Sequence, residues 1–169
     1  AGFAGMRSPA FAPDNSRVLY SFAEGGRQQI YSTNIQADDP KKLTDSQGIN
    51  NWPCFSPDGK QIVFGSSRDG NFDIYVMNSD GTDIRRLTRS SFQDIRPRFS
   101  PDGNRIAFVS HRNGNSEIYL INPDGTDLRR VTRHLERDDY PDWHADGNRL
   151  VIVSERSGQH DLYLVRAPR

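Results

Sequence analysis

The sequence predicts an all-β protein, a β-propeller of four-stranded antiparallel blades, and three observations support this fold. The chain repeats a pattern every 44 residues along its 169-residue length. It contains 14 glycines and 10 prolines, which is typical of short strands joined by tight turns. No helical spacing of apolar residues is sustained anywhere along it.

The repeat is carried by three series of residues at the same spacing. The turn series consists of Pro13-Asp14, Pro57-Asp58-Gly59, Pro101-Asp102-Gly103 and Ala145-Asp146-Gly147. The two aromatic series are Phe11, Phe55, Phe99 and Trp143, and Tyr31, Tyr75, Tyr119 and Tyr163. A period near 44 residues with several short apolar runs lies in the range of propeller blades.

One repeat unit shows how the strands follow each other. Its strands are predicted at residues 53–56, 61–66, 73–78 and 84–88. Gly59 can take the positive φ that the tight turn after the first strand requires, and Asp80-Gly81 is a favoured hairpin turn. The two middle strands are apolar on both faces, which indicates that neighbouring blades cover them from both sides. The last strand carries charge, as suits an outer edge exposed to water.

The chain is predicted to be one propeller region, residues 1–169, with an incomplete fourth blade. The blades span about residues 8–51, 52–95, 96–139 and 140–169. The fourth lacks its outer strand, because it has no counterpart to Leu87-Thr88. Residues 1–8 correspond to an inter-blade loop and supply no strand in its place. We therefore expect either a piece of a larger propeller or a homo-oligomer whose copies complete a ring.

The composition of the chain argues against several classes of partner and of binding site. The chain has 22 basic and 22 acidic residues, a balance that argues against charge-driven binding of nucleic acid or an anionic membrane. Its single cysteine, Cys54, allows neither an internal disulfide nor a cysteine-based zinc site. No run approaches the roughly 18 apolar residues of a membrane helix. Residues 1–6 lack the features of a signal peptide, so the signal of an exported parent protein would already have been removed.

The repeat motif resembles that of a known family. Phe55-Ser56-Pro57-Asp58-Gly59 followed by Ile74-Tyr75 is similar to the TolB-type propeller repeat, and the next copy, from Phe99 to Tyr119, matches equally well. The resemblance covers nearly the whole chain. It implies a propeller, usually of six or more blades, that is often periplasmic and often docks a protein such as the peptidoglycan-associated lipoprotein. The same repeat serves as a gating domain in prolyl-oligopeptidase-like and tricorn-type proteases.

No catalytic constellation is visible in the sequence. It contains no G-x-S-x-G, H-E-x-x-H or G-x-x-x-x-G-K motif, and its four histidines occupy different repeat positions. We therefore expect no enzymatic activity of the propeller itself, no resident metal and no cofactor. The turns Asp80-Gly81-Thr82-Asp83 and Asp124-Gly125-Thr126-Asp127 raise the alternative of calcium, but hairpin-turn chemistry explains them more simply, because the distant Glu of a calcium loop is missing.

A charged series accompanies the hairpin between the second and third strands of a blade. Each of three arginines precedes an acidic residue by five positions: the pairs are Arg68 and Asp73, Arg112 and Glu117, and Arg156 and Asp161. We interpret them as structural charge pairs. The alternative is a functional ring of guanidinium groups on one face of the disc. Blade one has Glu24 and Gln29 in these places.

A partner surface is predicted on one face of the disc. The near-identical turns after the first and third strands share one face and look structural, whereas the varied inter-blade loops and second hairpins lie on the other. These loops supply the aromatic residues and arginines that binding hot spots favour. The candidate partner-binding residues are Trp52, Phe92, Arg96, His134, Arg137 and Tyr140. Alternatively, Trp52 and Tyr140 only pack between blades.

Three functions remain open from the sequence. The first is a non-catalytic scaffold that binds a protein partner, expected in the periplasm with the cytoplasm as the alternative. The second is the gating or substrate-recognition part of a larger protease. The third is a propeller that binds a small ligand or glycan in its central funnel.

Overall fold

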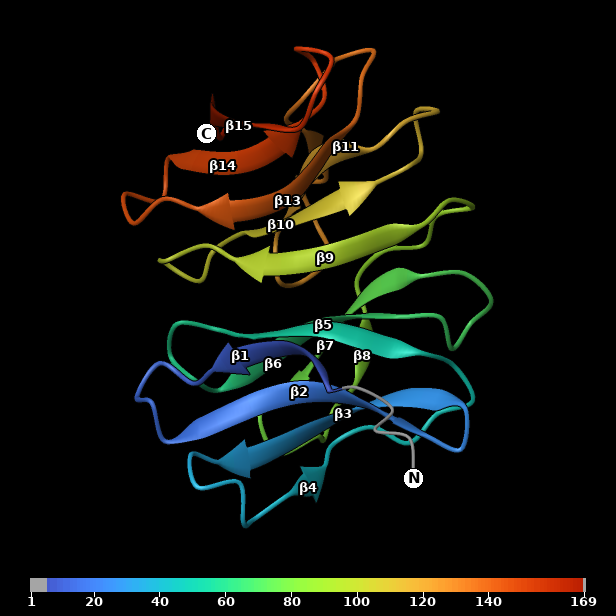
Figure 1. The fold of residues 1–169 in the computed structure, drawn as a ribbon, viewed down its shortest axis with the longest axis vertical. Helices are drawn as coiled ribbons and strands as arrows, with labels where there is room; N and C mark the ends of the chain where they lie inside the picture. Colours follow the sequence, from blue (N-terminus) through green and yellow to red (C-terminus); the bar gives the residue numbers. More distant parts are fainter. Residues whose placement is uncertain (1–5, 169) are drawn as a thin grey trace.

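The computed structural model describes residues 6–168; residues 1–5, on which most of the expectation about a signal peptide rests, and Arg169 lie outside this range. Within residues 6–168, all regular secondary structure is β-strand, arranged in four antiparallel sheets (Figure 1). Three sheets have four strands and the last has three among these residues, so the predicted all-β fold with a shorter fourth blade is confirmed. No helix able to cross a membrane occurs in this part of the chain.

Each sheet is one blade whose strands pair in sequence order. Blade one contains β1 (Arg7–Phe11), β2 (Arg17–Glu24), β3 (Arg27–Asn34) and β4 (Lys41–Lys42). Blade two contains β5 (Asn50–Phe55), β6 (Gln61–Ser66), β7 (Asp73–Asn78) and β8 (Arg85–Arg86). Blade three contains β9 (Asp94–Phe99), β10 (Ile106–Ser110), β11 (Glu117–Ile121) and β12 (Arg129–Arg130). Blade four contains β13 (Asp138–Trp143), β14 (Arg149–Ser154) and β15 (Asp161–Arg166).

Two details of the blades differ from the sequence prediction. Each first strand begins one or two residues before its predicted blade boundary, for example at Asn50 instead of residue 52. The outer strand β8 holds two residues, although a strand was predicted over 84–88. It stops because the N–H groups of Leu87 and Thr88 both point to the carbonyl of Ile74, at 2.8 and 3.4 Å, so the regular ladder ends there.

The blades follow one another along the long axis of the molecule, with blade one and blade four at its two ends (Figure 1). The first strands β1, β5, β9 and β13 contact each other in that order. Because strands alternate in direction, the turns that follow first and third strands share one face, which we call the turn face. The second hairpins and inter-blade loops share the other, the loop face.

Apolar contacts hold neighbouring blades together. We call the side of a blade that faces the next blade along the chain its forward face, and the opposite side its rear face. The forward face of each of the first three blades packs against the rear face of the next one. Between blades one and two, Leu19 and Ile30 meet Phe64 on the rear face of blade two. Ile74 and Ile118 take the place of Ile30 at the next two interfaces and are fully buried. Burying one such side chain stabilises the fold by roughly 1.5–3 kcal/mol.

Two blade faces have no covering blade among the described residues. On the forward face of blade four, Leu162 and Leu164 are 74% and 54% exposed. On the rear face of blade one, Val18 and Tyr20 border an open pocket of about 370 Å³. These two faces carry the same repeat positions that pair with each other at the three internal interfaces.

In blades one to three, a buried polar side chain near the start of the third strand fastens the outer part of the blade. Asp73 Oδ2 accepts a hydrogen bond from Arg86 of β8 at 2.6 Å, and its Oδ1 accepts from the Thr88 hydroxyl at 3.2 Å and the Ser90 N–H at 3.1 Å. Glu117 and Gln29 make equivalent bonds in blades three and one. This side chain therefore adds to the ladder pairing of β7 with β8 in holding the outer strand.

Replacing Asp73 by alanine should destabilise the fold strongly. Arg86 loses its buried partner and the Thr88 and Ser90 donors lose their acceptor, so the free energy of unfolding should fall by about 3 kcal/mol. Denaturant unfolding measures this change. Asp161 occupies the same repeat position in blade four but is half-buried and bonded to Ser157. Asp161→Ala should therefore cost less than about 0.5 kcal/mol; equal losses at both positions would contradict this account.

Candidate functional site

Each first strand contains one residue in the left-handed backbone region. These residues are Ser8, Trp52, Arg96 and Tyr140, with φ between 51° and 54°, and a proline follows each of them. The pairing register of all four first strands shifts at this point, as in a β-bulge. A bulge re-aims a side chain, and a non-glycine residue with positive φ is held there only by its surroundings.

The residue before the bulge supports this conformation. The Asn51 side chain accepts a hydrogen bond from the Trp52 N–H at 2.8 Å, and Asp139 accepts one from the Tyr140 N–H at 2.7 Å. Asn51 also accepts from the Ser8 hydroxyl of the preceding blade at 3.0 Å. The bulge therefore joins the inner strands of blades one and two.

Three of the predicted partner-binding residues meet in a stack where the first strands converge. The Arg96 guanidinium lies 4.1 Å from the ring centre of Tyr140 and 5.6 Å from that of Trp52. Its Nη1 contacts both carboxylate oxygens of Asp139 at 3.0 Å, and its Nη2 lies 3.1 Å from the Tyr140 hydroxyl. Arg137 binds the same carboxylate through its Nε at 3.1 Å. We call Trp52, Arg96, Arg137, Asp139 and Tyr140 the mouth cluster.

The mouth cluster borders open space. A pocket of about 400 Å³ is lined by residues from the first strands of all four blades, including Ser8, Trp52, Arg96 and Tyr140. Asp139 is 2% exposed, whereas Tyr140 is 55% exposed. The hydrogen bond to Asp139 raises the pKa of Arg137. Such a site can bind a flat aromatic or apolar group over Tyr140 and an acceptor at the arginines.

Trp52 has a packing role as well. Its ring lies 5.3 Å from that of Phe72 and packs with the core shared by blades three and four. A Cβ on Gly65 would come within 2.9 Å of the Trp52 ring, so only glycine fits beneath it. Trp52 therefore packs against the core, as the alternative states, and also lies close to Arg96.

The remaining two predicted residues, Phe92 and His134, lie in separate inter-blade loops. Phe92 is 50% exposed, and its carbonyl accepts a hydrogen bond from Asn71. His134 is half-buried, and its ring nitrogen accepts from the Glu136 N–H at 3.1 Å. Neither has a contact with the mouth cluster among the interactions of residues 6–168.

Sequence reasoning missed Asp139 and Ser8, although a signal for this position was present. Pro9, Pro53, Pro97 and Pro141 repeat at the 44-residue spacing and mark the bulge. The bulge residue and the residue before it therefore occupy the same repeat positions in all four blades. What the sequence could not supply is the direction of the side chains, because the left-handed backbone turns them away from ordinary strand alternation.

The partners predicted for the charged series are wrong. Arg112 reaches back to the first strand of its own blade, where its Nη2 lies 2.9 Å from Asp94. Its Nε donates to the Ser110 hydroxyl at 2.8 Å. Cross-strand pairing places Ser110 opposite Asp94 on one side and opposite Glu117 on the other. Glu117, the predicted partner, binds Arg130 of β12 instead.

The other two arginines follow the same pattern. Arg156 contacts Asp138 at 2.8 Å, and Arg68 donates to the side-chain oxygen of Asn50 at 2.9 Å. Asp73 binds Arg86, and Asp161 accepts from Ser157. Each arginine also lies over the tyrosine of the third strand, as Arg112 does at 4.8 Å from Tyr119. Burial raises the pKa of the Asp94 carboxyl, an effect that its hydrogen bonds to Ser110 and Arg112 oppose.

The acidic turns serve the backbone. The Asp80 carboxylate accepts from the Thr82 N–H at 2.9 Å and from its hydroxyl at 2.6 Å, and Asp124 does the same for Thr126. Among the described residues, no group of three or more His, Cys, Asp or Glu side chains is placed to hold a metal ion.

The chain matches the family model described as the TolB beta propeller domain over residues 1–96 and 89–168. The chain belongs to the TolB beta propeller family. Its resemblance to the TolB-type repeat is thereby confirmed. A search among curated protein sequences finds no match.

Solved TolB structures share this arrangement of blades. Putative TolB from Agrobacterium tumefaciens is 32% identical with a TM-score of 0.84, over 91% of this chain and 56% of that one. TolB from Acinetobacter baumannii is 30% identical with a TM-score of 0.87, over 96% of this chain and 41% of that one. The chain therefore spans about half the length of these TolB structures.

More distant structures share the fold alone. A puromycin hydrolase mutant complexed with PGG is 14% identical, with a TM-score of 0.76 over 96% of this chain and 27% of that one. The TolB-type propeller fold is thus also present in a hydrolase, and the likeness carries no information about activity at this identity.

Two variants of Asp94 should distinguish the stability contributed by its hydrogen-bond acceptor from that contributed by its negative charge. Asp94→Ala leaves Arg112 without its partner and should lower the free energy of unfolding by about 3 kcal/mol. Asp94→Asn reproduces the arrangement that Asn50 already makes with Arg68, so it should cost less than about 1 kcal/mol. Thermal and denaturant unfolding of both variants measure the difference. A loss as large for Asn as for Ala would mean that the charge itself is required.

Proposed function

We propose that the chain is a non-catalytic, protein-binding propeller whose partner docks on the loop face at the mouth cluster. The observation that carries this proposal is the stack of Arg96 between Tyr140 and Trp52 beside an open pocket. Tyr, Trp and Arg are the residues most enriched at binding hot spots, and here a buried carboxylate fixes the central arginine in place. A pre-organised site loses little side-chain freedom on binding.

Membership in the TolB beta propeller family supports a protein as the ligand, because the TolB-type repeat is associated with docking of the peptidoglycan-associated lipoprotein. For the same reason we propose a periplasmic location. Gating in a larger protease is the alternative, which the likeness to a puromycin hydrolase keeps open at the level of fold. The gene context, with or without a downstream hydrolase domain, distinguishes the two.

A titration with the soluble domain of a peptidoglycan-associated lipoprotein from the source organism tests the docking proposal. We expect saturable binding in calorimetry, and Arg96→Ala and Tyr140→Ala should each weaken it at least tenfold, as expected of hot-spot residues. Lys60→Ala on the turn face is the matched control and should bind like the wild type. Melting temperatures of all variants separate a lost contact from a lost fold.

The docking proposal fails if the wild type does not bind, or if Lys60→Ala weakens binding as much as Tyr140→Ala. Arg137→Ala adds a check on the role of the buried carboxylate. Asp139 keeps Arg96 as a partner in that variant, so the stack should survive and binding should weaken less than in Arg96→Ala.

We also propose that the two open blade faces pair between copies of the chain. The forward face of blade four and the rear face of blade one carry the repeat positions that meet at each internal interface, and a head-to-tail contact of this kind closes into a ring if the rotation allows. Light scattering should therefore detect an oligomer. Leu162→Asp places a charge on the open face and should return the protein to a monomer without loss of strand signal in circular dichroism; a wild type that is monomeric at micromolar concentration contradicts the proposal.

A further inference from the structure

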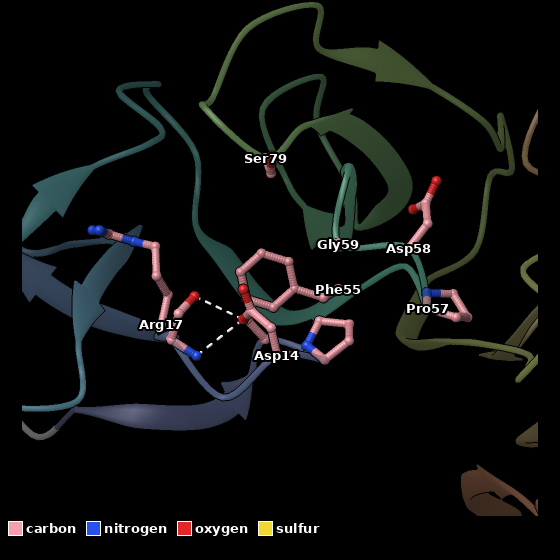
Figure 2. A pocket seen from close by; sticks show the side chains of 10 residues that line it. Asp14, Arg17, Phe55, Pro57, Asp58, Gly59 and Ser79 are labelled. Carbon is pink, nitrogen blue, oxygen red and sulfur yellow. Dashed lines mark hydrogen bonds between the residues drawn. The ribbon is translucent and has the colours of Figure 1, made fainter.

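A second open site lies on the turn face, opposite the mouth cluster. A pocket of about 480 Å³ opens between blades one and two. Blade one contributes Asp14 and Arg17 to its lining, and blade two contributes Phe55, Asp58 and Gly59 (Figure 2). The Phe55 ring lies in the middle of this group, and the Arg17 guanidinium points away from it (Figure 2). Phe55 is only half-buried.

The same groove between blades three and four is filled by an arginine of the chain itself. The Arg105 guanidinium lies 4.9 Å from the ring centre of Trp143. It donates hydrogen bonds to the carbonyl oxygens of Gly147 and Pro168, the latter at 2.9 Å. This groove therefore combines an aromatic ring with backbone acceptors to hold a guanidinium group.

The open pocket is built from the equivalent residues. Arg17, Phe55 and Gly59 lie 88 positions, or two repeats, before Arg105, Trp143 and Gly147. The aromatic ring and the glycine of the turn are thus present in both grooves. The difference between them is the direction of the arginine.

A neighbouring hydroxyl explains why the Arg17 side chain points back to its own blade and does not enter the groove. Arg17 Nε donates to the Ser32 hydroxyl at 2.6 Å, and its Nη1 donates to Asp39 at 3.1 Å. In blade three the position of Ser32 is taken by Leu120, which offers no acceptor. Arg105 therefore crosses to the next blade, whereas Arg17 is retained and leaves the groove open.

We propose that this pocket binds an arginine side chain presented by a polypeptide partner. The guanidinium would stack on Phe55 and donate to the carbonyl of Gly59, as Arg105 does on Trp143 and Gly147. The carboxylates of Asp14 and Asp58 border the pocket and complement the positive charge. This site is additional to docking at the mouth cluster. Because it lies on the opposite face, its failure in a binding test would leave the docking proposal unaffected.

The charges around the pocket favour a cation. A hydrogen bond from the Ser16 side chain lowers the pKa of Asp14, and one from the Ser56 side chain lowers that of Asp58, so both carboxylates are ionised at neutral pH. The counterpart of the Pro168 carbonyl is that of Asp80, which already accepts a hydrogen bond from Lys41 at 3.1 Å. An incoming arginine therefore relies on the ring, the Gly59 carbonyl and the two carboxylates.

Titration of the ¹⁵N- and ¹³C-labelled protein with an acetylated, amidated Gly-Arg-Gly peptide tests the site. We expect shifts of the Phe55 ring and Gly59 amide signals that saturate at millimolar peptide. The same peptide with citrulline, which keeps the shape and loses the charge, should leave them unchanged. Free arginine serves to show whether the flanking peptide adds affinity.

Variants of the ring and of the occupied groove complete the test. Phe55→Ala should weaken binding by about 3- to 30-fold, the range of a cation–π contact. Phe55→Trp copies the occupied groove and should bind more tightly, which keeps the proposal testable if the alanine variant unfolds. Arg105→Ala empties the second groove, so the arginine peptide should then also change the fluorescence of Trp143.

The proposal is overturned if the citrulline peptide shifts the same signals equally, or if Phe55→Trp binds no more tightly than the wild type. It is also overturned if Arg105→Ala gains a site at Trp143 while the wild type shows no shift at Phe55. That result would mean that the groove between blades three and four holds a guanidinium but the one between blades one and two does not.

Discussion

Each blade of this protein has two apolar faces, and this is the constraint on which the remaining structure depends. An isolated sheet could cover neither face, so a blade depends on packing against a neighbouring blade. Leu19 and Ile30 on one blade and Phe64 on the next illustrate the contact that recurs along the chain. Because the faces must meet, the inner strands are forced close together, and the positions of all loops follow from that approach.

Polar side chains solve the problems that this stacking creates. The outer strands form only short ladders, and Gln29, Asp73 and Glu117 bind the outer part of their three blades from inside the sheet. The inner strands are crowded, and the bulge at Arg96 and its equivalents turns a side chain toward the neighbouring blade. The mouth cluster arises from this bulge. The surface proposed for docking is therefore a by-product of the way in which inner strands pack.

The sequence predicted the blades because a repeat reports backbone geometry, which is the same in every copy. The 44-residue spacing of Tyr75 and Tyr119 and the turns at Gly59 and Gly103 placed the strands to within a few residues. It predicted the wrong partner for Arg112, because Glu117 is bound by Arg130 of the outer strand, a contact that separation along the chain does not show. The candidate surface was predicted in part: four of its six residues belong to the mouth cluster, whereas Phe92 and His134 lie apart.

The forward face of any one blade is made of the same repeat positions as that of every other, and so is the rear face. A blade can therefore be exchanged, duplicated or removed in whole 44-residue steps without creating a new kind of contact. Differences between individual blades, such as Ser32 in place of Leu120, would be moved together with the blade that contains them. Each blade is in this sense a portable unit whose few deviations from the repeat decide which grooves are filled and which stay open.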